Sequence, residues 1–173
     1  SITYSDYDSE DSTRLNLSSF NLSLANYKDL AYEHGSIKYL VGYNEALYFL
    51  QEKRCGVAGV GRSVIQTGSG DNLVSLSTNV IGNERYYVGE YGVGSHPESV
   101  AFKDGMIYFS DVNANKVLRI DSQGLTVISD VGMSSYFENK FGSISKYNSH
   151  LVGGGIDDDN DHYIVHSGEV TTS

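Results

Sequence analysis

The chain of 173 residues has the length of one domain, and its 39% hydrophobic and 20% charged residues are typical of a globular protein rather than a disordered one. A formal net charge of -10 with no Lys/Arg cluster argues against nucleic acid or an anionic membrane surface as partner. A single cysteine, Cys55, excludes an internal disulfide framework and a zinc site of several cysteines.

The abundance of glycine and tyrosine indicates a turn-rich β protein. The chain contains 19 glycines and 14 tyrosines but a single proline and no tryptophan. Tyrosine suits half-buried strand faces because its ring packs while its hydroxyl reaches water. No apolar run approaches the length that is needed to span a bilayer, so we expect no membrane segment.

Residues 1–36 differ from the remainder and are predicted to form an irregular amino-terminal arm. An acidic, serine-rich lead is followed by a stretch whose apolar side chains could form one docking edge. The pattern "NYKDLAYEHG" favours one or two helical turns ended by Gly35. The candidate interface residues of the arm are Leu17, Phe20 and Leu22.

From residue 37 to residue 173 the sequence predicts one β-rich domain of strands and tight turns. Hairpins are expected around Asn44-Glu45 and around "GSGDN" at 68–72, and the stretch 132–142 is expected to be irregular. In "AFKDGMIYFSDVNANKVLRI", residues 101–120, two alternating strands flank a polar turn. Asn and Asp tolerate left-handed backbone and bond their own main chain, so this stretch is typical of a hairpin.

A strand-turn plan recurs along the chain. "YNEALYF" (43–49), "FKDGMIYF" (102–109) and "YNSHLVG" (147–153) each place an aromatic residue before a polar turn and an apolar strand. The recurrences lie about 60 and 45 residues apart, near the length of a four-stranded propeller blade. The pattern therefore favours propeller-like blades in an incomplete or open ring, with a sandwich or a plain meander as alternatives.

Two motifs suggest ligand sites. "GVAGVGRS", residues 56–63, has the spacing of a phosphate-binding loop, but the β-branched residues that follow cannot form the required helix. We therefore interpret it as a glycine-rich strand connection. In "IDDDNDHYIVHS", the carboxylates of Asp157, Asp159 and Asp161 could bind calcium. The flanking apolar residues make a solvated hairpin tip the preferred interpretation, and no other cofactor is indicated.

Catalytic patterns are weak. The sequence has neither a G-x-S-x-G elbow nor an H-E-x-x-H pair. Glu98 with Asp111 could mimic a glycosidase carboxylate pair, but any acidic β protein offers such pairs. A carbohydrate-binding or carbohydrate-cleaving fold is the alternative hypothesis, with Glu90 or Glu98 as acid. The tyrosines that would stack on sugar rings are Tyr86, Tyr87 and Tyr91.

Three stretches resemble segments of large virion structural proteins of tailed, crAss-like bacteriophages that are associated with the tail or the neck. They are "YNEALYFLQEKRCGV" at 43–57, the stretch 89–137 from "GEYGVGSHPES" to "GMSSYF", and "HLVGGGIDDDNDHYIVH" at 150–166. The resemblance covers most of residues 12–167, and its central stretch is the most specific. The chain departs from the family pattern at Cys55-Gly56-Val57, where a more polar strand end is expected, and in the acidic hairpin, which has no proline.

The resemblance implies a propeller-like segment of a longer polypeptide that packs against other virion subunits or the rest of its own chain. It implies a location in the virion, assembled in the host cytoplasm, and no catalytic residues. We therefore expect an all-β interaction module that acts through its surfaces. One form of this hypothesis has several copies of the chain packing together as a homo-oligomer. The carbohydrate hypothesis stays open beside it.

Overall fold

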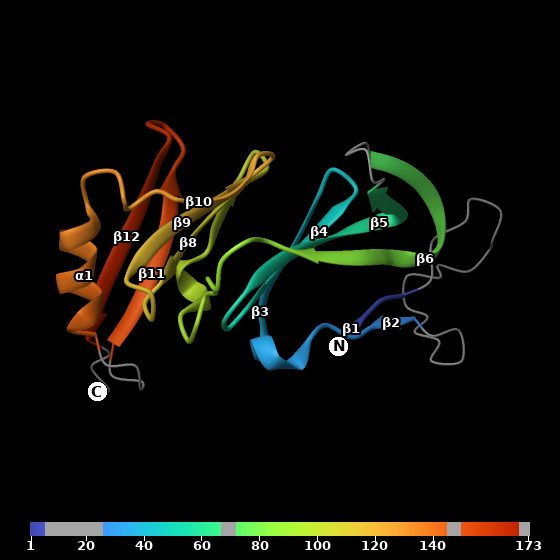
Figure 1. Ribbon diagram of the computed structural model, residues 1–173. Helices are drawn as coiled ribbons and strands as arrows, with labels where there is room; N and C mark the ends of the chain where they lie inside the picture. Colours follow the sequence, from blue (N-terminus) through green and yellow to red (C-terminus); the bar gives the residue numbers. More distant parts are fainter. Residues whose placement is uncertain (6–25, 67–71, 145–149, 170–173) are drawn as a thin grey trace.

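The computed structural model describes residues 1–5, 26–66, 72–144 and 150–169, and in these the chain forms stacked antiparallel sheets (Figure 1). Two sheets have four strands each, in the orders β3-β4-β5-β6 and β10-β9-β8-β7. Two further sheets, β1-β2 and β11-β12, have two strands each. None closes into a barrel, so the prediction of an all-β fold with open, hairpin-built sheets is confirmed.

The first four-stranded sheet is a meander of consecutive antiparallel strands. The predicted hairpin at Asn44-Glu45 is present, and both residues have positive φ, 48° and 58°, as a tight two-residue turn requires. The second predicted hairpin pairs Ser63 with Ser75, whereas its turn lies outside the described residues. The strands are β3 (Ile37–Tyr43), β4 (Ala46–Gln51), β5 (Cys55–Gln66) and β6 (Asn72–Tyr86).

The second four-stranded sheet repeats this meander. The hairpin predicted in residues 101–120 is formed by β8 and β9, and Asn115 adopts the expected left-handed backbone, with φ 57°. The turn at Asp104-Gly105 joins β7 to β8 as the turn at Asn44-Glu45 joins β3 to β4, so the first two sequence recurrences occupy equivalent places. The strands are β7 (Ala101–Lys103), β8 (Met106–Asp111), β9 (Lys116–Asp121) and β10 (Gly124–Val127).

The carboxyl-terminal layer combines a hairpin with a helix. β11 (His150–Asp157) and β12 (His162–Glu169) pair around the acidic tip, as predicted. The prediction that residues 132–142 are irregular is wrong, because Ser134–Gly142 forms the α-helix α1. Phe137 and Phe141 lie one helical turn apart and pack into a buried cluster, and this burial outweighs the low helix propensity of the Ser, Asn and Gly residues.

The largest core lies between the two four-stranded sheets. Alternate residues of each strand point into it, which is why Ile107 and Phe109 are fully buried. Their neighbour Tyr108 points to the opposite face and stacks on Tyr163 of β12. The buried members of this core are Leu50, Cys55, Val93, Ile107, Phe109, Leu118 and Ile120. Each large apolar side chain buried in this way contributes about 1.5–3 kcal/mol.

The outer faces of the two sheets are covered by smaller clusters. Ile2 of β1 (Ile2–Thr3) packs with Phe49, Ala58 and Ile81 on the far face of the first sheet. On the far face of the second sheet, Val117 packs with Phe141 of α1 and Val152 of β11. The sheets therefore lie in successive layers, each buried against the next (Figure 1).

The described parts of the amino-terminal arm lie against the first sheet. β1 pairs with β2 (Tyr27–Lys28), and the predicted helical turn is a short 3-10 helix, Tyr32–His34. Gly35 ends it with φ 82°, as the sequence indicated. The division into an arm of residues 1–36 and a domain of residues 37–173 stays a prediction. Leu17, Phe20 and Leu22 lie outside the described residues.

Candidate functional site

A buried carboxylate connects the two four-stranded sheets. Oδ2 of Asp111, at the end of β8, accepts a hydrogen bond of 3.0 Å from the backbone nitrogen of Gly92. Its Oδ1 accepts from the backbone nitrogens of Asn113 and Ala114, at 3.0 Å each. Burial raises the pKa of Asp111, against the lowering effect of these three N–H donors. The side chain thus organises the turn and holds the inter-sheet connection.

The connection itself runs along the first sheet. The backbone nitrogens of Val93 and Gly94 donate to the carbonyl oxygens of Gln51 and Glu52, at 3.1 and 3.0 Å. Gly92 lies so close to the backbone of Glu52 that a Cβ atom would overlap the Glu52 carbonyl. A glycine is therefore required where the chain crosses from one sheet to the next.

Tyr86 fastens the arm to the first sheet. Its hydroxyl donates to Oε1 of Gln51 at 3.0 Å and accepts from the backbone nitrogen of Ala31 at 3.1 Å. Nε2 of Gln51 donates to the carbonyl oxygens of Ala31 and Gly35, at 3.0 and 2.7 Å. The buried amide of Gln51 is therefore satisfied, and the phenol of Tyr86 serves packing rather than an external ligand.

The 3-10 helix Pro97–Ser99, which precedes β7, contacts the β11-β12 hairpin at one carbonyl group. The hydroxyl of Tyr163 donates to the carbonyl oxygen of Ser99 at 2.6 Å. Gly154 passes over the same carbonyl so closely that a Cβ atom would overlap its oxygen. At the hairpin tip, Nζ of Lys103 lies 2.7 Å from Oδ1 of Asp161 and 3.1 Å from Oδ1 of Asp158. These contacts hold the hairpin against β7.

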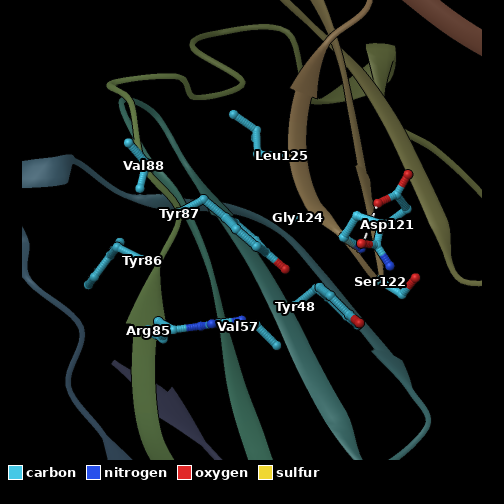
Figure 2. A pocket seen from close by; sticks show the side chains of 11 residues that line it. Tyr48, Val57, Arg85, Tyr86, Tyr87, Val88, Asp121, Ser122, Gly124 and Leu125 are labelled. Carbon is cyan, nitrogen blue, oxygen red and sulfur yellow. Dashed lines mark hydrogen bonds between the residues drawn. The ribbon is translucent and has the colours of Figure 1, made fainter. Parts of the chain in front are cut away.

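A cleft opens between the two four-stranded sheets, beside the buried core (Figure 2). Its volume is about 490 Å³, and its walls come from β4 to β6 on one side and from the β9-β10 turn on the other. In Figure 2 the phenol rings of Tyr48 and Tyr87 extend toward the turn that carries Asp121 and Ser122. The lining residues are Tyr48, Val57, Arg85, Tyr86, Tyr87, Val88, Asp121, Ser122, Gln123, Gly124 and Leu125.

The cleft contains only some of the residues that the sequence suggested for sugar binding. Tyr86 and Tyr87 line it, whereas Tyr91 packs against the buried core. Glu90 lines a separate hollow with Glu33 and Lys53. Glu98 lies in the 3-10 helix Pro97–Ser99 and is not among the residues that line the cleft.

Sequence reasoning found only Tyr86 and Tyr87 of this cleft and missed its other lining residues, among them Tyr48, Arg85, Asp121 and Gln123. The recurrence at 43–49 drew attention to Tyr48, but only as a strand aromatic. No local signal joins β4 to the β9-β10 turn, because the two segments meet only after the sheets have packed face to face. The pairing of Glu98 with Asp111 finds no support, since the Asp111 carboxylate is occupied by backbone donors.

The acidic hairpin tip is organised by internal contacts. Oδ1 of Asp157 accepts from the backbone nitrogen of Asp159 at 3.0 Å, and Oδ2 accepts from Nδ2 of Asn160 at 2.8 Å. Asp161 is paired with Lys103. Within the described ranges, no group of three or more His, Cys, Asp or Glu side chains is arranged to hold a metal ion. Calcium binding by Asp157, Asp159 and Asp161 stays a prediction.

The remaining motifs have structural roles. Residues 56–63 lie within β5, which continues as a strand to Gln66, where a phosphate-binding loop would require a helix. Cys55 is buried, its Sγ donates to the carbonyl oxygen of Tyr91 at 3.3 Å, and burial raises the pKa of its thiol. Such a thiol is a poor nucleophile. Across the part of the chain that the structure describes, no helix is long and apolar enough to cross a membrane.

Comparison with known proteins identifies one matching family. The family model described as Crassvirus muzzle protein matches residues 2–161 of the chain. No curated protein matches it. The match extends over the described layers from β1 to the tip of the β11-β12 hairpin.

Proposed function

The chain belongs to the Crassvirus muzzle protein family and is a structural protein of the phage virion, and we propose that it acts at the tail or neck by packing against other subunits, without catalysis. The all-β fold and the residence in the virion agree with the resemblance seen in the sequence. The tail or neck position, the absence of catalysis and assembly in the host cytoplasm are parts of the proposal.

The observation that carries this proposal is the open outer face of the β11-β12 hairpin. Leu151 and Ile164 lie on it with 42% and 55% of their surfaces exposed. Between them a Cβ atom added at Gly153 or Gly155 would meet nothing within 4 Å. The inner face of the same hairpin is buried against the second sheet. Among the described layers, the last one thus presents an uncovered outer face, as suits a surface that packs on another subunit.

Edges and a second apolar patch offer further contacts. The strand order leaves β3 and β6, and β7 and β10, at the edges of their sheets, where backbone groups favour pairing with another strand. Val131 and Met133, just before α1, and Tyr136, in its first turn, are 84%, 45% and 54% exposed. We propose that these surfaces contact other virion subunits, further copies of this chain or the rest of its own polypeptide.

The amino-terminal arm completes this proposal. Its described parts already pack on the first sheet through Ile2 and through the contacts of Tyr86. We propose that Leu17, Phe20 and Leu22 extend the same docking to a neighbouring subunit. The two four-stranded meanders would then be successive blades of a propeller-like arrangement that is completed by other parts of the assembly.

Glycan cleavage is the less favoured function. A glycosidase needs two carboxylates flanking one bond at a defined separation. Of the acidic residues considered, Asp111 is held by backbone donors, and Glu90 and Glu98 are not among the residues lining the aromatic cleft. These placements support a role in binding or packing rather than in bond cleavage.

Cross-linking mass spectrometry on purified virions tests the proposal. We expect cross-links from exposed lysines of this chain to tail or neck subunits, and a particle reconstruction that covers Leu151 and Ile164. Ile164→Asp should reduce incorporation into particles, whereas Tyr32→Asp, at another exposed site, should not. Absence of the chain from mature particles, or cross-links confined to the capsid shell, would contradict the proposed location.

A further inference from the structure

The cleft between the four-stranded sheets has the size and position of a ligand site. Its volume of about 490 Å³ lies within the range of roughly 300–1,000 Å³ that is common for small-molecule sites, which often form where two units meet. A second hollow of about 570 Å³ shares Tyr48, Asp121, Ser122 and Gln123 with it. The two hollows therefore adjoin at the β9-β10 turn.

Two tyrosines supply the aromatic part of the cleft. The rings of Tyr48 and Tyr87 both pack partly against the buried core, which fixes their positions. Burial raises the pKa of Tyr87 to about 12, and the neighbouring Tyr48 and Asp121 act in the same direction, whereas Arg85 acts against them. The Tyr87 hydroxyl therefore lies in the electrostatic neighbourhood of these three side chains, on the side of the cleft that faces the turn (Figure 2).

The polar groups of the cleft are available to a ligand. Among the described residues, the hydroxyls of Tyr48 and Tyr87 and the guanidinium of Arg85 have no hydrogen-bond or ion-pair partner. Arg85, Ser122 and Gln123 are exposed. Asp121, by contrast, is paired with Arg119 at 2.8 Å and accepts from the backbone nitrogen of Gln123 at 2.8 Å. Aromatic faces thus lie beside several free donors and acceptors.

This combination fits a sugar ring better than a peptide or a nucleic acid. A pyranose presents an apolar face of C–H groups, which packs on an aromatic ring, and a rim of hydroxyls, which need paired donors and acceptors. A peptide anchor would call for a deep apolar pocket, whereas the groups here are largely polar. The net charge of -10 disfavours a polyphosphate.

We propose that this cleft binds the sugar residues of a glycan, with the rings of Tyr48 and Tyr87 as the aromatic platform and the Tyr48 hydroxyl, Arg85 and Gln123 as hydrogen-bonding groups. Arg85 is the one cation among the residues that line the cleft, and it has no counter-charge among the described residues, so the bound part of the ligand carries at most one acidic group. The site binds and does not cleave, since its one carboxylate, Asp121, is held by Arg119 and by its own turn.

Saturation-transfer NMR and calorimetry with the intact chain test this site. The probes are neutral oligosaccharides of glucose and N-acetylglucosamine and an acidic oligosaccharide of galacturonic acid. We expect binding of at least one probe, weakened about tenfold by Arg85→Gln and by Tyr48→Phe, since each removes a hydrogen bond to the ligand. If the acidic probe binds more tightly than the neutral probes and this preference is lost in Arg85→Gln, the ligand is an acidic sugar. If the neutral probes bind as tightly as the acidic one, the ligand is a neutral sugar.

Matched controls separate the site from general effects. Tyr136→Phe removes an exposed tyrosine hydroxyl far from the cleft in sequence and should leave the affinity unchanged. Equal melting temperatures of all variants would show that the fold is intact. The proposal is overturned if no probe binds at millimolar concentration, if the cleft variants bind as the parent does, or if an acidic peptide competes for the cleft while sugars do not.

Discussion

The backbone nitrogen of Gly92 donates a hydrogen bond to the side chain of Asp111 across the junction of the two four-stranded sheets, at 3.0 Å. Asp111 is 4% exposed and is the last residue of β8, whereas Gly92 belongs to the connection leaving the first sheet. One acidic residue that sequence patterns associate with catalysis thus holds two layers together. Gln51, Tyr86 and Tyr163 likewise use polar side chains to hold parts of the fold together rather than to bind a ligand.

Asp111→Asn should destabilise the fold. The amide oxygen can still accept from Asn113 and Ala114, but the amide nitrogen then faces the N–H of Gly92, and two donors oppose each other. We expect the free energy of unfolding to fall by about 1–3 kcal/mol in urea titrations. Asp29→Asn, at a side chain that is 74% exposed, should change it little. Equal stability of both variants would contradict the role of Asp111.

The same residue predicts a pH dependence. Its pKa is raised in the folded protein, so the folded state binds the proton more tightly than the unfolded state does. The contribution of Asp111 to stability therefore falls as the pH rises from the ordinary value, 3.8, through the raised one. The stability difference between the parent and Asp111→Asn should accordingly widen as the pH is lowered through this window. If the stability difference between the two proteins became smaller as the pH is lowered, the pKa of Asp111 would not be raised in the folded protein.

Two adjacent glycines of β11 should respond in opposite ways to alanine. In Gly154→Ala the new methyl group overlaps the carbonyl oxygen of Ser99, and the hairpin must move away from the second sheet. We expect a loss of about 1–3 kcal/mol. In Gly155→Ala the methyl group meets nothing within 4 Å, and reduced chain entropy should stabilise by about 0.5 kcal/mol. The melting temperatures of Gly154→Ala and Gly155→Ala measure both effects. Similar melting temperatures would show that the close contact of Gly154 with Ser99 is unimportant.

Tyr86→Phe should loosen the arm. The change removes the hydroxyl that bonds Gln51 and Ala31 and leaves a buried amide oxygen unpaired, at an expected loss of about 1–3 kcal/mol. Limited proteolysis should then cut residues 26–35 faster than in the parent. Tyr136→Phe, 54% exposed, is the control. Unchanged cleavage in Tyr86→Phe would mean that other contacts hold the arm.

Chelation tests the calcium hypothesis at the hairpin tip. Asp157 is satisfied by Asp159 and Asn160, and Asp161 is neutralised by Lys103. We therefore expect EDTA to leave the melting temperature unchanged and added calcium to raise it by no more than a general salt effect. A melting temperature that falls with EDTA, and is restored by calcium but not in Asp159→Asn, would establish a metal site.

The helix α1 shows where local sequence reasoning fails. "SSYFENKFG" contains four Ser, Asn and Gly residues of low helix propensity beside its two phenylalanines, so the stretch favours irregular structure when it is considered alone. In the folded chain, Phe141 is 1% exposed and packs on Val117 and Val152, which come from other layers. Tertiary burial decides the conformation here, and no pattern within the helix reports it.

The cleft illustrates the same limit for function. Tyr86 and Tyr87 were found from the sequence because aromatic residues cluster there, yet Tyr48 comes from β4 and Gln123 from the β9-β10 turn, both far away in the chain. Glu90 and Glu98, which are neighbours of these tyrosines in sequence, lie elsewhere in space. Proximity along a chain of hairpins is a poor guide to proximity in a site.

The amino-acid sequence by itself determined the strands, the tight turns and the all-β class, because two-residue alternation and Asn, Asp and Gly at turns act over a few neighbouring residues. It also carried enough family-specific pattern to indicate a virion protein, which the family match bears out. Only the tertiary structure decided which polar side chains hold the layers together and which remain open to a ligand. That choice depends on how sheet faces stack, and stacking brings together residues that no local interaction relates.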